Sequence, residues 1–151
     1  MHIFSYALYQ SRQTVPLMCW SVEAGFPSPA EGQVDEALDL NELLIEHPHA
    51  TYFVRVRGDS MRDAGIHHGD LLIVDRALLP RSGDVIVAAL NGEFTVKRWR
   101  ELSELSSSKQ KSGALVRGEL VPAHPQYAPI RVTAEDDFMV WGVVRYTIHR
   151  P

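Results

Sequence analysis

From residue 51 onward, short apolar runs alternate with turn-forming residues, which is the pattern of a β-rich domain. Residues 52–57 alternate between two faces, as a half-buried strand does, whereas residues 71–74 form a continuous apolar run typical of a fully buried strand. Asn91-Gly92 is the strongest short hairpin signal in the chain. We expect strands over residues 52–57, 71–74, 84–90, 93–99, 115–121 and 138–148. The predicted fold is mainly β, mostly antiparallel, and forms a small partly open barrel or packed sheets.

One short helix is predicted before these strands. Asp39 can cap the helix, and Glu42, three residues later, can bond back to the cap N–H. Leu40, Leu43, Leu44 and His47 would share a face that packs inward. Pro48 would end the helix.

Residues 1–35 are predicted to form a flexible N-terminal arm, with residues 36–151 as the β-rich domain. Pro16, Pro27 and Pro29 interrupt any long helix in the arm. The arm is also shorter than the roughly 50 residues that an independent core requires. The Ser-rich and charged segment 101–113 is expected to be a surface loop between strands.

Composition narrows the classes of function. The 151 residues are 45% hydrophobic and 23% charged, as in an ordinary globular protein, and the net charge of −4 disfavours tight, direct binding to DNA. The single cysteine, Cys19, excludes an internal disulfide framework. We found no apolar run of a membrane span's length and no signal-peptide pattern, so a cytoplasmic protein is expected.

The candidate chemistry lies at a serine and a lysine. Ser60 follows Gly58 in a predicted tight turn, and Lys97 lies within an apolar strand. A serine hydroxyl becomes a good nucleophile when a neighbouring base takes its proton, and lysine is such a base only when it is neutral. Burial can lower the pKa of lysine from about 10.4 toward the roughly 7–8 that suits a base.

Neighbouring groups could support this pair. Thr95 lies two residues before Lys97, so its hydroxyl should point to the same face of the strand and hold the amine. The backbone N–H groups of Asp59 and Ser60 could stabilise an oxyanion. Met61 is expected to pack beneath the turn. Ala24 and Gly25 form a small-residue bond in the arm, which suggests a protein that cuts itself.

Four segments together resemble the LexA/UmuD family of self-cleaving serine proteins, and most closely its UmuD-like members. The segments are Gly58 to Met61, Gly65 to Asp75, Gly83-Asp84 and Asn91 to Arg98. UmuD-like features are also present in residues 25–30, 39–45, 47–48 and 127–130. The similarity is dense over about residues 22–100 and looser over 120–145. Residues 1–21 and the long 101–113 segment depart from the pattern.

The resemblance implies a fold like the LexA C-terminal domain, with Ser60 as nucleophile, Lys97 as general base and Ala24-Gly25 as the cleaved bond. It also implies cleavage stimulated by a RecA filament on single-stranded DNA. The shortened chain would form a homodimer and join a UmuC-like Y-family polymerase subunit in error-prone lesion bypass during the SOS response. No cofactor is implied.

Three other functions would differ in the features of the chain that they require. A LexA-like repressor would need a DNA-binding domain before the cut, and a signal-peptidase-like enzyme would need a membrane anchor. A dimeric scaffold that never cuts would need neither. A metal site is not expected: His47 and His49 are separated by proline, His67 and His68 are adjacent, and His124 and His149 are isolated in the sequence.

Overall fold

The computed structural model describes residues 4–5, 13–18, 24–25, 34–102 and 116–151. The chain divides into two compact units. One consists of Met1–Tyr6 and His47–Pro151, and the other of Ala7–Glu46. The division into an arm of residues 1–35 and a body of residues 36–151 stays a prediction. Most of the expected 101–113 loop lies outside the described residues.

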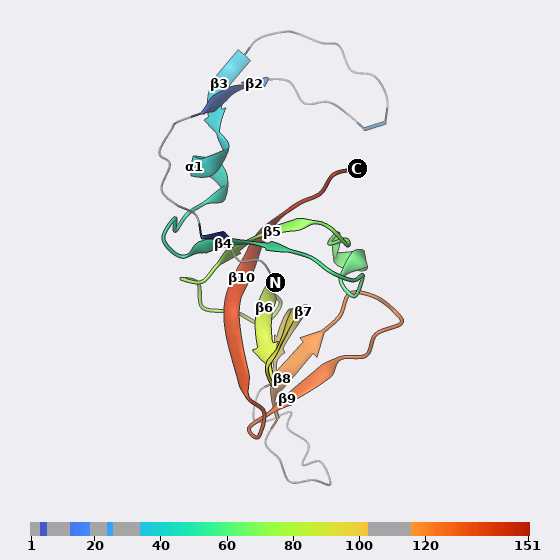
Figure 1. Ribbon diagram of the computed structural model, residues 1–151. Coiled ribbons are helices and arrows are strands. Elements are labelled where there is room, and N and C mark those ends of the chain that lie inside the picture. The colour runs from blue at the N-terminus through green and yellow to red at the C-terminus, as the bar shows by residue number, and fades with distance from the viewer. Residues whose placement is uncertain (1–3, 6–12, 19–23, 26–33, 103–115) are drawn as a thin grey trace. The chain divides into compact units, whose positions relative to one another are not determined.

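The larger unit is built on one eight-stranded antiparallel sheet (Figure 1). Its strands are β1 (Phe4–Ser5), β4 (Thr51–Arg55), β5 (Leu71–Asp75), β6 (Val85–Leu90), β7 (Glu93–Glu101), β8 (Val116–Val121), β9 (Ile130–Thr133) and β10 (Phe138–Ile148). The order across the sheet is β1-β4-β5-β10-β6-β7-β8-β9. The expected mainly β, antiparallel fold is therefore confirmed.

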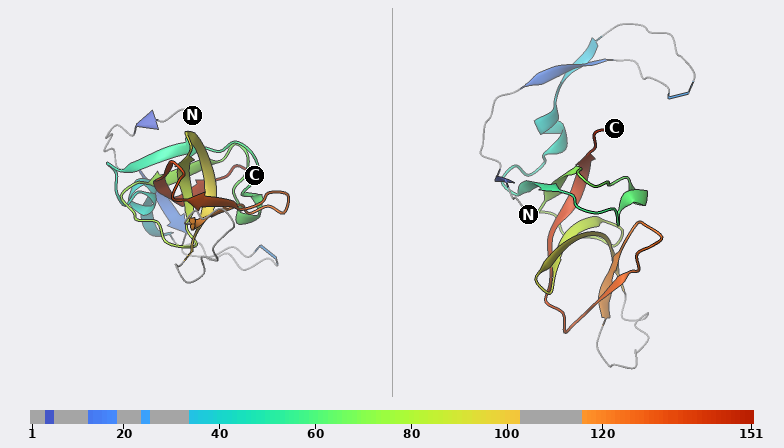
Figure 2. Two further views of the ribbon diagram at one scale, coloured as in Figure 1. Left: turned by 90° about the horizontal axis from the view of Figure 1, so that it is seen from below. Right: turned by 45° about the vertical axis from the view of Figure 1, so that its right-hand side comes forward.

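The sheet stays open, with β1 and β9 at its two edges. The long strand β10 lies between β5 and β6 and joins the early strands to the later hairpin. In the other two views, β4 and β5 cross the direction of β6 and β7, so the sheet is strongly twisted (Figure 2). The sequence pattern predicted β10 but not β9, which is only four residues long.

The β6–β7 hairpin forms where Asn91-Gly92 predicted it. Both turn residues have positive φ, 50° at Asn91 and 85° at Gly92, as a tight two-residue hairpin turn requires. The resulting register places Lys97 of β7 opposite Ile86 of β6, a residue that is completely buried. The hairpin thus carries a lysine into the interior of the domain.

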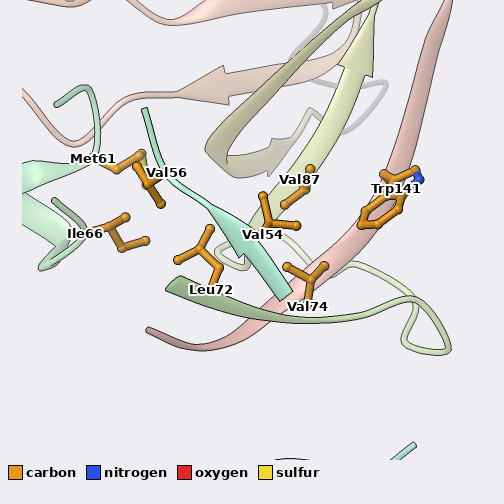
Figure 3. Close-up of a cluster of buried hydrophobic side chains, with 8 residues drawn as sticks. All are labelled: Val54, Val56, Met61, Ile66, Leu72, Val74, Val87 and Trp141. Carbon is orange, nitrogen blue, oxygen red and sulfur yellow. The ribbon is translucent and has the colours of Figure 1, made fainter. Parts of the chain in front are cut away.

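A core of apolar side chains lies against the serine-bearing loop (Figure 3). The core contains Val54, Val56, Met61, Ile66, Leu72, Val74, Val87 and Trp141. Met61 and Ile66 come from the connection between β4 and β5, and Figure 3 shows both beside Val56. As expected, Met61 packs beneath the turn, where it is only 2% exposed. This core fixes the base of the loop that carries Ser60.

Truncation of this core should destabilise the whole unit. Leu72 is fully buried, so Leu72→Ala removes packed methyl groups and should lower the free energy of unfolding by about 2–5 kcal/mol. Leu79 is 87% exposed, and Leu79→Ala should change it by less than about 0.5 kcal/mol. Urea denaturation followed by circular dichroism measures both. Equal losses for the two variants would show that Leu72 does not belong to a close-packed core.

The smaller unit contains β2 (Thr14–Met18), which pairs with β3 (Val34–Asp39), and the helix α1 (Leu40–Leu44). The predicted helix start is confirmed, because the Asp39 carboxylate accepts a 2.8 Å hydrogen bond from the N–H of Asn41. Among the helices of the described part of the chain, none is long and apolar enough to cross a membrane.

The prediction that this helix packs an apolar face inward was wrong. Leu40 and Leu43 are 54% and 52% exposed, and the helix ends at Leu44, well before Pro48. The physical reason is that strand β3 continues to Asp39, which leaves only five residues for the helix. Little more than one turn cannot present a continuous apolar stripe. His47 lies beyond the helix and contacts Asp75 at 2.6 Å.

Candidate active site

Ser60 lies in a tight turn between β4 and β5. Gly58 has φ of 90°, a conformation that glycine adopts without the steric cost of a side chain. The turn is closed by a 3.0 Å hydrogen bond from the N–H of Arg62 to the carbonyl of Asp59, and a single 3₁₀ turn, Arg62–Ala64, follows. With Met61 buried below it, the turn holds Ser60 at the edge of the core.

Lys97, which lies on β7 of the β6–β7 hairpin, contacts this serine. Its side chain is 8% exposed, and its Nζ lies 2.8 Å from Ser60 Oγ. Thr95 lies on the same face of β7, as its spacing predicted, and its Oγ1 is also 2.8 Å from Nζ. The structure therefore brings together the three side chains that the sequence singled out.

Nζ of Lys97 lies among three oxygen atoms, which can accept all three N–H donors of an ammonium. Besides the two hydroxyls, Nζ lies 3.0 Å from the carbonyl oxygen of Val96. A neutral amine has two N–H donors and one lone pair. In that neutral form, the Val96 carbonyl and the Thr95 hydroxyl can accept the two N–H donors, and the lone pair would then face the Ser60 hydroxyl. The structure thus places the amine within hydrogen-bond distance of the Ser60 hydroxyl.

Burial shifts the protonation equilibrium of Lys97 toward the neutral amine. Desolvation in the apolar interior lowers the pKa of Lys97 below its ordinary value of 10.5, since removal of water penalises the ammonium more than the amine. Within the described residues, the salt bridges of the larger unit do not involve Lys97. The lowered pKa and the 2.8 Å contact both favour a base at this position.

A second segment, residues 122–127, forms hydrogen bonds with the turn that contains Ser60. The N–H of Ala123 donates to the carbonyl of Ser60 at 2.8 Å, and the N–H of Asp63 donates to the carbonyl of Ala123 at 2.8 Å. These backbone bonds fix both sides of the turn. The sequence reasoning missed them, because main-chain bonds between distant segments leave no pattern in side-chain types.

Side chains of the same segment hold Asp59. The Tyr127 hydroxyl donates a 2.7 Å hydrogen bond to Asp59 Oδ1, and His124 Nε2 lies 3.6 Å from Asp59 Oδ2. The hydrogen bond from Tyr127 is the main reason why the pKa of the Asp59 carboxyl is lowered. Tyr127 belonged to a segment that resembled UmuD-like proteins, but the sequence alone assigned it no position in the site. The oxyanion-binding role of the Asp59 N–H stays a prediction.

The expected cleavage bond lies in the smaller unit. Ala24 and Gly25 form an exposed bend there. Glycine and alanine at a bend leave the backbone open to an approaching group. Phe26 to Ala30 and Cys19 lie outside the described residues.

A serine hydroxyl within hydrogen-bond distance of a buried amine is an arrangement suited to a serine peptidase. Comparison with known proteins agrees with this class. The sequence of residues 16–145 matches the protein family described as "Peptidase S24-like", and the chain belongs to this family. The resemblance stated from the sequence motifs is thereby confirmed.

Curated relatives match over most of the chain. It is 39% identical to protein SamA of Salmonella typhimurium over 139 residues, which cover 92% of this chain and 88% of SamA. It is 36% identical to protein MucA of Escherichia coli, over 89% of this chain and 84% of MucA. It is also 39% identical to the LexA repressor of Delftia acidovorans, but the match covers only 49% of that repressor.

Proposed function

We propose that this protein is a peptidase that hydrolyses its own Ala24-Gly25 bond, with Ser60 as nucleophile and Lys97 as general base. The observation that carries the proposal is the 2.8 Å contact between Lys97 Nζ and Ser60 Oγ, formed at a lysine that is 8% exposed. Membership of the Peptidase S24-like family supports the same class of reaction.

The chemistry follows the two-step route of serine peptidases. Neutral Lys97 takes the proton from the Ser60 hydroxyl while Oγ bonds to the Ala24 carbonyl carbon. The N–H groups of Asp59 and Ser60 would stabilise the resulting oxyanion. As the bond to Gly25 breaks, the lysine ammonium gives its proton to the departing nitrogen. Water then hydrolyses the ester on Ser60, which releases residues 1–24 and restores the serine.

Tethering makes this reaction efficient and also controllable. A substrate bond on the same chain, or on a paired copy, is presented at a high effective concentration, which can contribute several kcal/mol to the barrier reduction. Thr95 would hold the amine while the bond approaches. Since the reactive pose must be populated before attack, a partner that favours this pose would raise the rate in proportion to its population.

The proposed biological role is in SOS mutagenesis. Stimulated by a RecA filament on single-stranded DNA, the chain would cut itself. The shortened chain would form a homodimer that serves as the accessory subunit of a UmuC-like, error-prone translesion polymerase. The resemblance to UmuD-like proteins and the long matches to SamA and MucA support this role. It would require a cytoplasmic protein.

A LexA-like repressor is the second candidate function. The match to the LexA repressor favours it, but that match spans only 49% of the repressor's length, whereas the matches to SamA and MucA span 88% and 84% of theirs. Operator-specific DNA binding by the intact chain would support the repressor. A scaffold of the same fold that never cuts would remain intact under all conditions.

Mass spectrometry of the purified chain with an activated RecA filament tests the cleavage bond. We expect two products, one ending at Ala24 and one beginning at Gly25. Ala24→Glu should slow their formation by at least about 10-fold, because a long charged side chain obstructs close approach of the serine turn. Ala37→Glu, the same change at an exposed position of β3, should cleave normally. Cleavage at another bond, or equal rates for both variants, would contradict the proposal.

A further inference from the structure

A group of three potential metal ligands lies in the larger unit, apart from the serine and lysine. His67 and Asp70 belong to the turn just before β5, and His149 follows the end of β10. Their ligand atoms all lie within 4.8 Å of one another. The two histidine rings are 4.7 Å apart between centroids. The fold thus gathers residues as far apart in the chain as His67 and His149.

Asp70 is the buried centre of this group, since it is only 4% exposed. Its Oδ1 lies 2.7 Å from His149 Nδ1, and its Oδ2 accepts a 2.8 Å hydrogen bond from the backbone N–H of His67. The Thr147 hydroxyl lies 3.4 Å from the same Oδ2. These contacts fix the carboxylate between the two imidazoles.

His67 provides an independent sign that the group is incomplete. Its Nδ1 is buried and has no hydrogen-bond partner among the described residues. That nitrogen lies 3.7 Å from Asp70 Oδ2, which is too long for a hydrogen bond. A metal ion could therefore bind this nitrogen without the loss of an existing hydrogen bond.

We propose that His67, Asp70 and His149 bind a divalent transition metal ion of the zinc type. Two imidazole nitrogens and one carboxylate form a donor set that zinc accepts, with water completing a tetrahedron. Mg²⁺ and Ca²⁺ prefer oxygen ligands and fit this set poorly. This inference departs from the sequence-based expectation of no metal site, which treated His149 as isolated.

Small side-chain movements would complete the site. Ligand atoms around tetrahedral zinc are about 3.4 Å apart, given bond lengths of roughly 2.0–2.2 Å. The 2.7 Å contact of His149 with Asp70 would lengthen, and the 3.7 Å contact of His67 would shorten. Both histidine side chains are more than 40% exposed, so they have room to turn.

A bound ion would brace the loop that carries Ser60. The N–H of Val56, four residues before that serine, donates to the carbonyl of Asp70, and the N–H of Gly69 donates back to the carbonyl of Val56. The N–H of Ile66 donates to the carbonyl of Met61. A metal held by His67, Asp70 and His149 would therefore join the end of β10 to the same loop.

Titration of the tag-free, metal-depleted full chain with Zn²⁺ in a calorimeter tests the site. We expect binding of one ion, weakened at least about 10-fold in His67→Ala and in His149→Ala. His49→Ala, which removes an imidazole outside the group, should bind as the unaltered chain does. Circular dichroism verifies that each variant is folded.

Co²⁺ gives a second readout that does not depend on stability. Cobalt in a tetrahedral nitrogen and oxygen site should produce visible absorption bands, and these should disappear in the double variant His67→Ala, His149→Ala. If the double variant bound Zn²⁺ as tightly as His49→Ala, or if the unaltered chain bound none, the assignment would be overturned. The cluster would then be a hydrogen-bonded triad without an ion.

Discussion

Ser60→Ala should abolish self-cleavage. The substitution removes the Oγ that lies 2.8 Å from Lys97 Nζ, so no acyl intermediate can form on the chain. We expect the rate to fall by about 10⁴-fold or more, in line with removal of a peptidase nucleophile. The measurement is the loss of intact chain over time by mass spectrometry, with and without the RecA filament.

The fold should survive this change, so that the loss can be assigned to chemistry. The contacts that hold the turn to residues 122–127 do not use the Ser60 hydroxyl: the Ala123 N–H donates to the Ser60 carbonyl, and Tyr127 donates to Asp59. Ser82→Ala provides a matched control, because Ser82 lies in another loop and its hydroxyl accepts from the Glu101 N–H. Cleavage of Ser60→Ala at the rate of Ser82→Ala would exclude Ser60 as the nucleophile.

Local patterns predicted the pieces of the site well. Asn91-Gly92 defined a hairpin, and the period-two alternation along β7 put Thr95 and Lys97 on one face. Both features depend on residues close together in the chain, where steric rules act directly. Gly58 likewise marked the tight turn before Ser60. The contact between this turn and Lys97 was proposed from family motifs and the chemistry of the two side chains.

The sequence could not predict the features that arise from strand order. Placement of β10 between β5 and β6 depends on long-range pairing, and it is this placement that brings His149 to Asp70. The same limit concealed the contact of Tyr127 with Asp59. The helix error had a different origin: periodicity favoured an inward face at Leu40 and Leu43, but β3 continued to Asp39 and left too few residues for one.

The rate of self-cleavage should rise with pH and then level off at a plateau. The midpoint, which is the pH at which the rate is half of the plateau rate, should lie below 10.5, the ordinary pKa of lysine. Desolvation lowers the pKa of Lys97 from that ordinary value, so the neutral amine becomes the major form at a lower pH than in an exposed lysine. Below the midpoint, the neutral fraction and therefore the rate should rise about 10-fold for each pH unit. Rates of the intact chain, measured without RecA across the alkaline range, give the profile.

Lys97→Ala should remove this pH dependence and lower the plateau rate by about 10²–10⁴-fold, the usual contribution of a general base. Arg98→Ala is the matched control: it removes a cation one residue along β7, from an exposed side chain, and should retain the profile. If Lys97→Ala kept the unaltered chain's rate and midpoint, another group would be the base. A midpoint at or above 10.5 in the unaltered chain would instead show that burial does not activate this lysine.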